Sequence, residues 1–166
     1  MRLAVTDANI FIDLIKLDLV AHLFVIELEI FTTAEVLEEL NDHQTEVLNG
    51  FHREGLLSIH VLTNDQHKAV GALKIHVGLS YTDRTVIVLA KVLGAIVVTG
   101  DGAMRRFCGA QKLEVRGILW LFDCFLQFQC ISHAIAVEKM EGLMRINNRL
   151  PVEECLERLK KWRGGT

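Results

Sequence analysis

The sequence has little proline and no long apolar run. One of its 166 residues is proline, and 51% are hydrophobic, which excludes a disordered or linker-rich chain. The two most apolar runs, Val86–Ala90 and Ile118–Phe122, are each followed by a charged residue and fall far short of the roughly 18 residues that a membrane helix needs. We therefore expect a globular chain that does not enter a membrane.

Common redox, zinc and export signals are also absent. The cysteines form no C-x-x-C pair, and the histidines show neither H-x-H nor H-E-x-x-H spacing. We therefore expect reduced thiols in a core, and oxygen ligands for any metal. The N-terminal segment reaches Asp7 too soon for a secretory signal peptide, so we expect a cytoplasmic protein.

The net charge of −3 at first disfavours a nucleic-acid partner. If four of the acidic residues share one metal site, however, the rest of the chain is close to neutral. Basic residues also cluster, at Arg105–Arg106, at Lys112–Arg116 and at Arg158–Arg163. Net charge therefore does not exclude RNA.

Short apolar runs that are typical of strands alternate with longer segments of helical spacing. This alternation predicts βαβ units, and hence an α/β fold: a three-layer α/β/α sandwich around a central, mainly parallel sheet. One helix is expected to begin near Asn9 and to continue to Leu23, and another to end near Gly78. The expected strands are Leu3–Asp7, Leu28–Phe31, Leu57–Leu62, Ala95–Thr99 and Leu113–Val115.

Two helices without a strand are expected at the C-terminal end. Ser132 caps the first, which runs to about Asn147, and Pro151 takes the first position of the second. We therefore divide the chain into a domain over residues 1–130 and a helical extension over residues 131–166. The extension is expected to pack on the domain or on a partner, which includes a second copy of the chain.

Carboxylates stand where strands end. Asp7 and Asp101 each follow a predicted strand, and ligands of parallel sheets bind beyond the carboxyl ends of the strands. Asp83 begins a very apolar helix and shares a face with Ile87, so its charge needs compensation. Each of these aspartates has an alternative interpretation as a helix cap.

The segment after the second strand supplies a fourth acid. Glu35 is most simply a capping partner of Thr32. At ~100° per residue, the apolar stripe of this helix is centred near Leu40, which places Glu39 beside the core and Glu38 toward water. We therefore choose Glu39.

Four acids in one cleft would repel one another unless divalent cations were bound. Oxygen ligands suit Mg²⁺ or Mn²⁺, which can activate water and stabilise the charge that develops on a phosphodiester. The short polar side chains of Thr6, Asn9 and Thr99 either orient the carboxylates or water, or are simply turn residues.

These motifs resemble those of the PIN domain over roughly residues 1–130. The resemblance rests on Asp7-Ala-Asn9 after the first strand, a helix that ends at Glu39-Leu40, Asp83 at the start of an apolar helix, and Val98-Thr-Gly-Asp101 after a strand. It implies a Mg²⁺- or Mn²⁺-dependent ribonuclease whose catalytic, metal-binding acids are Asp7, Glu39, Asp83 and Asp101.

The resemblance also implies partners. Many bacterial members are VapC-type toxins that an antitoxin protein holds inactive. Where members place a further acid after the position of Asp101, this chain has Met104, Arg105 and Arg106, and we expect these two arginines to contact RNA phosphates.

Two other classes of function compete with the nuclease. The first is a non-catalytic PIN-like module that binds protein or nucleic acid and uses its acids only as helix caps. The second is an aspartate-dependent phosphatase or receiver-like domain. It is disfavoured because a phosphatase of the haloacid dehalogenase type needs a second acid where Asn9 stands.

Overall fold

The computed structural model describes residues 1–73 and 78–165. In this part of the chain a single sheet has five parallel strands in the order β3-β2-β1-β4-β5. This confirms the α/β class and the central parallel sheet. The strands are β1 (Arg2–Thr6), β2 (Leu28–Thr33), β3 (Leu57–His60), β4 (Ile96–Val98) and β5 (Val115–Arg116).

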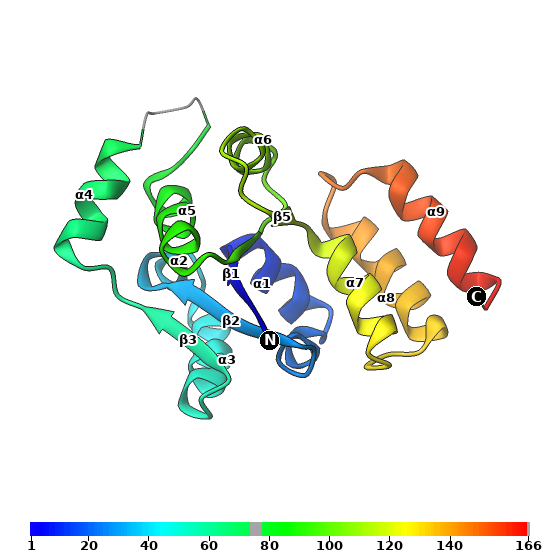
Figure 1. The fold of residues 1–166 in the computed structure, drawn as a ribbon. Helices are drawn as coiled ribbons and strands as arrows, with labels where there is room; N and C mark the ends of the chain where they lie inside the picture. The colour runs from blue at the N-terminus through cyan, green and yellow to red at the C-terminus, as the bar shows by residue number, and fades with distance from the viewer. Residues whose placement is uncertain (74–77, 166) are drawn as a thin grey trace.

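The chain winds in two directions from β1. It first builds outward to β2 and β3, and then returns to the other side of β1 for β4 and β5. Crossovers between parallel strands are almost always right-handed, so the helices of the two halves cover opposite faces of the sheet. In Figure 1, β1 lies between α1 (Ala8–Lys16) and α5 (Tyr81–Leu93). The reversal between β1 and β4 is the place where such sheets bind ligands.

Helix α5 crosses the middle of the sheet and packs on β1, β2 and β4. Ser80 caps its N-terminus, and Gly94 ends it in the left-handed conformation at φ 62°. Six consecutive residues, Thr85 to Ala90, are buried. The remaining helices of the first half are α2 (Ala34–Glu38), α3 (Asp42–Arg53), α4 (Asn64–Ala72) and the 3₁₀ helix η1 (Val20–Phe24).

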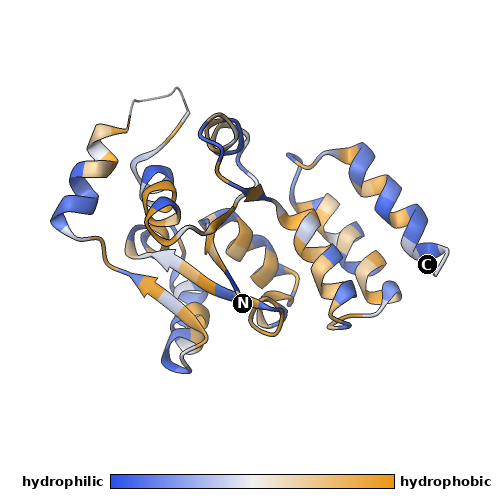
Figure 2. Ribbon diagram, in the orientation of Figure 1, coloured by the Kyte–Doolittle hydropathy of each residue, from blue (hydrophilic) through white to orange (hydrophobic). Residues whose placement is uncertain are grey.

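Four helices complete the chain: α6 (Gly102–Ala110), α7 (Ile118–Gln127), α8 (His133–Ile146) and α9 (Val152–Arg163). Figure 2 shows that α7 is largely hydrophobic, whereas α9 is largely hydrophilic. On α9, Trp162 is 4% exposed and its ring lies nearly parallel to that of Phe122. Asn147, after α8, donates to Asp13 on α1 at 2.8 Å (Nδ2 to Oδ2). The extension therefore packs on the α/β domain.

Several expected boundaries differ from the structure. Helix α1 ends at Lys16, because the chain turns at Asp18 with φ 56°. The last strand lies at Val115–Arg116, slightly later than expected, and Pro151 is the N-cap of α9 and not its first helical residue. Residues 74–77, which the helix expected to end near Gly78 would include, lie outside the described residues.

Two further expectations concern cysteines and membrane spans. All four cysteines are free thiols, and Cys108, Cys124 and Cys155 are buried. Burial raises the pKa of the Cys108 thiol to about 11, so it stays protonated at neutral pH. In the described ranges, no helix combines the length and the apolar character needed to cross a membrane.

Candidate active site at the carboxyl edge of the sheet

Asp7 lies at the point where the sheet reverses direction. It follows β1 and caps α1, with its Oδ1 accepting from the backbone N–H of Ala8 at 2.6 Å. Its Oδ2 accepts from the Thr99 hydroxyl at 2.8 Å, and its own N–H donates to the Val98 carbonyl at 3.0 Å. Asp7 is 2% exposed. The carboxylate is therefore fixed between β1 and β4.

Charge on Asp7 is unfavourable. Burial, above all, raises the pKa of the carboxyl from 3.8 to about 6, and the nearby charges of Asp83 and Glu39 raise it further. The hydrogen bonds from Thr99 and Ala8 lower this pKa but do not outweigh the burial. A bound cation would favour the charged form.

Asp101 occupies the corresponding place after β4. It caps α6, with its Oδ1 accepting from the Met104 N–H at 2.8 Å. Its own N–H donates to the Thr99 hydroxyl oxygen at 3.1 Å. The buried Thr99 hydroxyl therefore bridges Asp7 and Asp101.

Asp83 lies in the first turn of α5. Ser80 and Asp83 form a capping box, in which Asp83 Oδ2 accepts from the Ser80 N–H at 2.8 Å and Ser80 Oγ accepts from the Asp83 N–H at 3.0 Å. Burial is the main reason that the pKa of this half-buried carboxyl is raised, and the charge of Asp101 adds to the effect. Among the described residues, Asp83 Oδ1 has no hydrogen-bond partner, so it remains available to a ligand.

Glu39 is placed differently from the expectation. Helix α2 ends at Glu38, so Glu39 is its C-cap, and both glutamates are exposed. The ~100° rule that placed Glu39 beside the core does not apply beyond the last helical residue. Even so, the charge of Glu39 raises the pKa of Asp7, which places it within electrostatic reach of the site.

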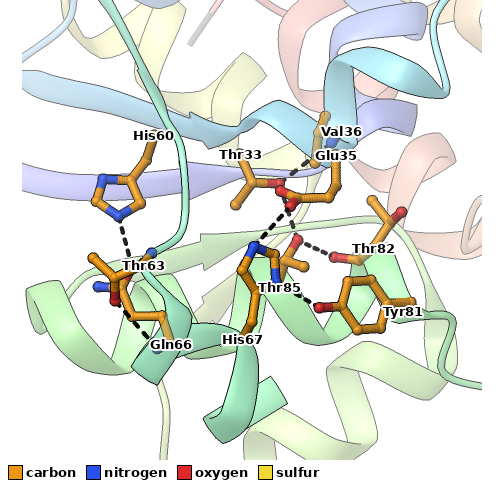
Figure 3. A network of polar contacts seen from close by, with 10 residues as sticks. All are labelled: Thr33, Glu35, Val36, His60, Thr63, Gln66, His67, Tyr81, Thr82 and Thr85. Carbon is orange, nitrogen blue, oxygen red and sulfur yellow. Dashed lines mark hydrogen bonds and ion pairs between the residues drawn. The ribbon is translucent and has the colours of Figure 1, made fainter. Parts of the chain in front are cut away.

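The expected capping pair of Thr32 and Glu35 does not form. Thr33 is the N-cap of α2, and the Thr32 hydroxyl donates to the Thr6 carbonyl at 2.9 Å. Glu35 faces His67 on α4, with 3.8 Å between Oε1 and Nε2 (Figure 3). Nearby, a 2.9 Å hydrogen bond joins the hydroxyls of Thr33 and Thr85 and ties β2 to α5.

The other predicted neighbours differ in their surroundings. Thr6 is buried, and within the described ranges its Oγ1 has no hydrogen-bond partner. Asn9 is exposed in the first turn of α1. Both arginines after Asp101 are exposed, and Arg105 Nη1 donates to the Thr99 carbonyl at 3.4 Å. This hydrogen bond places the Arg105 guanidinium at the end of β4.

The acids are electrostatically coupled without forming a closed cage. The charges of Asp83 and Glu39 raise the pKa of Asp7, and the charge of Asp101 raises the pKa of Asp83. In residues 1–73 and 78–165, no three His, Cys, Asp or Glu side chains are grouped closely enough to hold a metal ion as they stand. The donor set contains only oxygen, which fits Mg²⁺ or Mn²⁺ better than zinc.

A family model described as a PIN domain matches residues 3–163. The chain belongs to the PIN-domain family. The match continues beyond residue 130, where the resemblance was expected to end, and includes α8 and α9. No curated protein matches the chain. PIN domains are generally nucleases and typically use divalent metals, so this PIN domain has the fold of a nuclease family.

The sequence alone did not indicate one polar network of this PIN domain. His67 Nδ1 lies 2.6 Å from the Tyr81 hydroxyl, and His67 also faces Glu35 (Figure 3). The three side chains come from α4, α5 and α2, so no local spacing relates them.

Proposed function

We propose that this PIN domain is a Mg²⁺- or Mn²⁺-dependent endoribonuclease that hydrolyses RNA phosphodiesters. One observation carries the proposal: Asp7 is almost fully buried, and its pKa is raised to about 6 by burial and by two further acids. Buried carboxylates with a strongly raised pKa are concentrated at functional sites, because burying their charge destabilises the fold.

The choice of helix caps argues against a purely structural role. Five helices are capped by a neutral side chain: Thr33, Asn41, Thr63, Ser80 and Ser132. Only the two helices that begin at the ends of β1 and β4 have carboxylate caps, within the part of the chain that the structure describes. A neutral cap would serve those helices equally well. The acids are therefore best explained by a ligand that needs negative charge.

Each residue has a distinct role in the proposed reaction. Asp7, Glu39, Asp83 and Asp101 would hold the metal. When bound, it would lower the pKa of a coordinated water and stabilise the charge that develops on the phosphodiester. Thr99 keeps the Asp7 carboxylate oriented through its 2.8 Å hydrogen bond. The exposed guanidinium groups of Arg105 and Arg106 bind RNA phosphates.

Cleavage of an end-labelled single-stranded RNA in Mn²⁺ tests the proposal. The wild type should cleave and EDTA should abolish cleavage, while Asp7→Asn should lower kcat by about 100-fold or more. Asp13→Asn is the matched control. Asp13 lies within α1, which Asp7 caps; like Asp7 it is buried and accepts a 2.8 Å hydrogen bond from a side chain, but its partner, Asn147, belongs to the extension. This control should retain activity.

The neighbouring pair of exposed glutamates tests the fourth ligand. Glu39→Gln should slow cleavage, whereas Glu38→Gln should not, because only Glu39 affects the pKa of Asp7. Equal rates for the two variants would remove Glu39 from the site.

RNA binding without cleavage, unchanged by Asp7→Asn, would instead support the non-catalytic binding module. The toxin role, an antitoxin partner, a homodimer and the cytoplasmic location stay predictions.

A further inference from the structure

Two aromatic side chains, Tyr81 and His67, meet edge to edge beside Glu35 (Figure 3). Tyr81 Oη and His67 Nδ1 are 2.6 Å apart, and the two ring planes differ by 12°. Rings stacked face to face keep their atoms about 3.5 Å or more apart. A 2.6 Å contact between edge atoms of nearly parallel rings therefore places the rings side by side in almost one plane. Tyr81 and His67 together form a flat surface, which we call the aromatic plate.

The plate is held at both ends. His67 uses Nδ1 toward Tyr81 and Nε2 toward Glu35, whose Oε2 is buried and has no hydrogen-bond partner among the described residues. The guanidinium carbon of Arg84 lies 5.5 Å from the centroid of the Tyr81 ring. The same guanidinium donates to the carbonyls of Ser80 and Val70, at 3.4 and 3.5 Å. These contacts restrain the orientation of both rings.

The plate remains accessible although it is restrained. Tyr81 is 43% exposed, and the His67 side chain is 37% exposed. Burial of these rings therefore contributes little to the core. A rigid, flat and solvent-accessible aromatic surface is the arrangement on which single-stranded nucleic acids stack their bases.

The plate and Asp83 share the first turn of α5. Tyr81 and Asp83 belong to the same first turn of α5, and two residues correspond to about 200° around a helix, so they point to different sides of that turn. Glu35 and Glu39 likewise belong to one short segment after β2. Tyr81 and Asp83 therefore lie on opposite sides of the start of α5, one helix width apart.

From this geometry we propose that the aromatic plate stacks against an unpaired base of the RNA and so positions a nucleotide beside the phosphodiester that the acids act on. The inference rests on the proposed function and deepens it. A paired base has both faces covered by its neighbours, so the substrate is single-stranded at this nucleotide. Tyr81 makes the contact with the base, while His67 and Glu35 are positioning residues that hold the Tyr81 ring.

A fluorine label tests the contact directly, because Tyr81 is the only tyrosine of the chain. Protein that carries 3-fluorotyrosine gives a single ¹⁹F resonance from this ring. It is titrated in EDTA, in the Asp7→Asn background, with a short single-stranded RNA and with an abasic oligonucleotide of the same length. We expect the RNA to shift the resonance in a saturable way and the abasic chain, which has the phosphates but no bases, to leave it nearly unchanged.

Substitutions separate stacking from folding. Tyr81→Leu should weaken RNA binding by about 10- to 100-fold and raise KM more than it lowers kcat. Tyr81→Phe keeps the ring but loses the 2.6 Å contact with His67, so it should bind RNA more weakly than the wild type and more tightly than Tyr81→Leu. Phe128→Leu is the matched control, since Phe128 is also a partly exposed ring (38%) but lies at the end of α7. Phe128→Leu should bind RNA like the wild type.

The outcomes distinguish this proposal from the proposed function. Equal ¹⁹F shifts with RNA and abasic chain, or unchanged affinity in Tyr81→Leu, would overturn the plate even if the protein cleaves RNA. Base-dependent shifts in a protein that never cleaves RNA would overturn the nuclease and leave the plate as a binding site.

Discussion

Neutralising Asp7 should stabilise the metal-free protein. The pKa of this carboxyl rises from 3.8 to about 6 in the folded state, a difference of about two, which corresponds to ~3 kcal/mol at ~1.4 kcal/mol per pKa unit. In Asp7→Asn the charge is lost, but an amide has one acceptor oxygen, so either Thr99 or Ala8 loses its acceptor at a cost of ~1–1.5 kcal/mol. The variant should therefore gain ~1–2 kcal/mol at neutral pH.

The contribution of Asp7 to the free energy of unfolding should fall as the pH rises from about 4 to about 6. Because the pKa of Asp7 is higher in the folded state, this state binds the proton more tightly. The contribution of Asp7 to stability is fully present below about pH 4, is lost as the pH rises to about 6, and stays absent above that. Asp7→Asn should lack this decline, so the two proteins should differ most near neutral pH.

Urea denaturation of both proteins in EDTA, between about pH 4 and pH 8, measures this difference. Millimolar Mn²⁺ should then stabilise the wild type and have little effect on the variant, since binding to the folded state raises stability. The reasoning would be refuted by an Asp7→Asn variant that is less stable than the wild type at neutral pH and equally dependent on pH. Such a result would mean that Asp7 is an ordinary cap without electrostatic strain.

Two predictions concern the C-terminal helices. Trp162→Ala should lower the free energy of unfolding by about 3–5 kcal/mol, because the ring is 4% exposed and packs on Phe122. A loss below ~1 kcal/mol in urea denaturation would show that α9 is not part of the common core. Asn147→Ala leaves the buried Asp13 carboxylate without its donor and should cost about 1–3 kcal/mol. The same substitution should cost clearly less in an Asp13→Asn background, and equal costs would exclude the coupling.

The alternation of short apolar runs with helical segments predicted the sheet well, because each strand lies between helices and needs apolar residues on both faces. It predicted the length of α1 poorly. Leu17, Leu19, Val20 and Leu23 continue the apolar spacing because all of them enter the core, although the chain has already left the helix at Asp18. Burial alone does not distinguish a helix from a turn that packs equally well.

In the candidate site, too, some features could be predicted from the sequence and others could not. Asp7 and Asp101 could be located from the sequence because the carboxyl ends of parallel strands meet at one edge. The exposure of Glu39 could not be predicted from the sequence, because it depends on the residue at which α2 ends. The aromatic plate could not be predicted from the sequence either, because Tyr81 and His67 meet only when α4 packs against α5.

The central place of β1 has a consequence for synthesis of the protein. β1 is translated before its neighbour β4, which comprises Ile96–Val98, so one side of β1 stays unpaired until the chain has been translated beyond β4. Asp101 follows β4, and only then can it join Asp7. Until then a nascent polypeptide lacks the paired Asp7 and Asp101, so the messenger RNA on which it is made is not exposed to the proposed activity before β4 has formed.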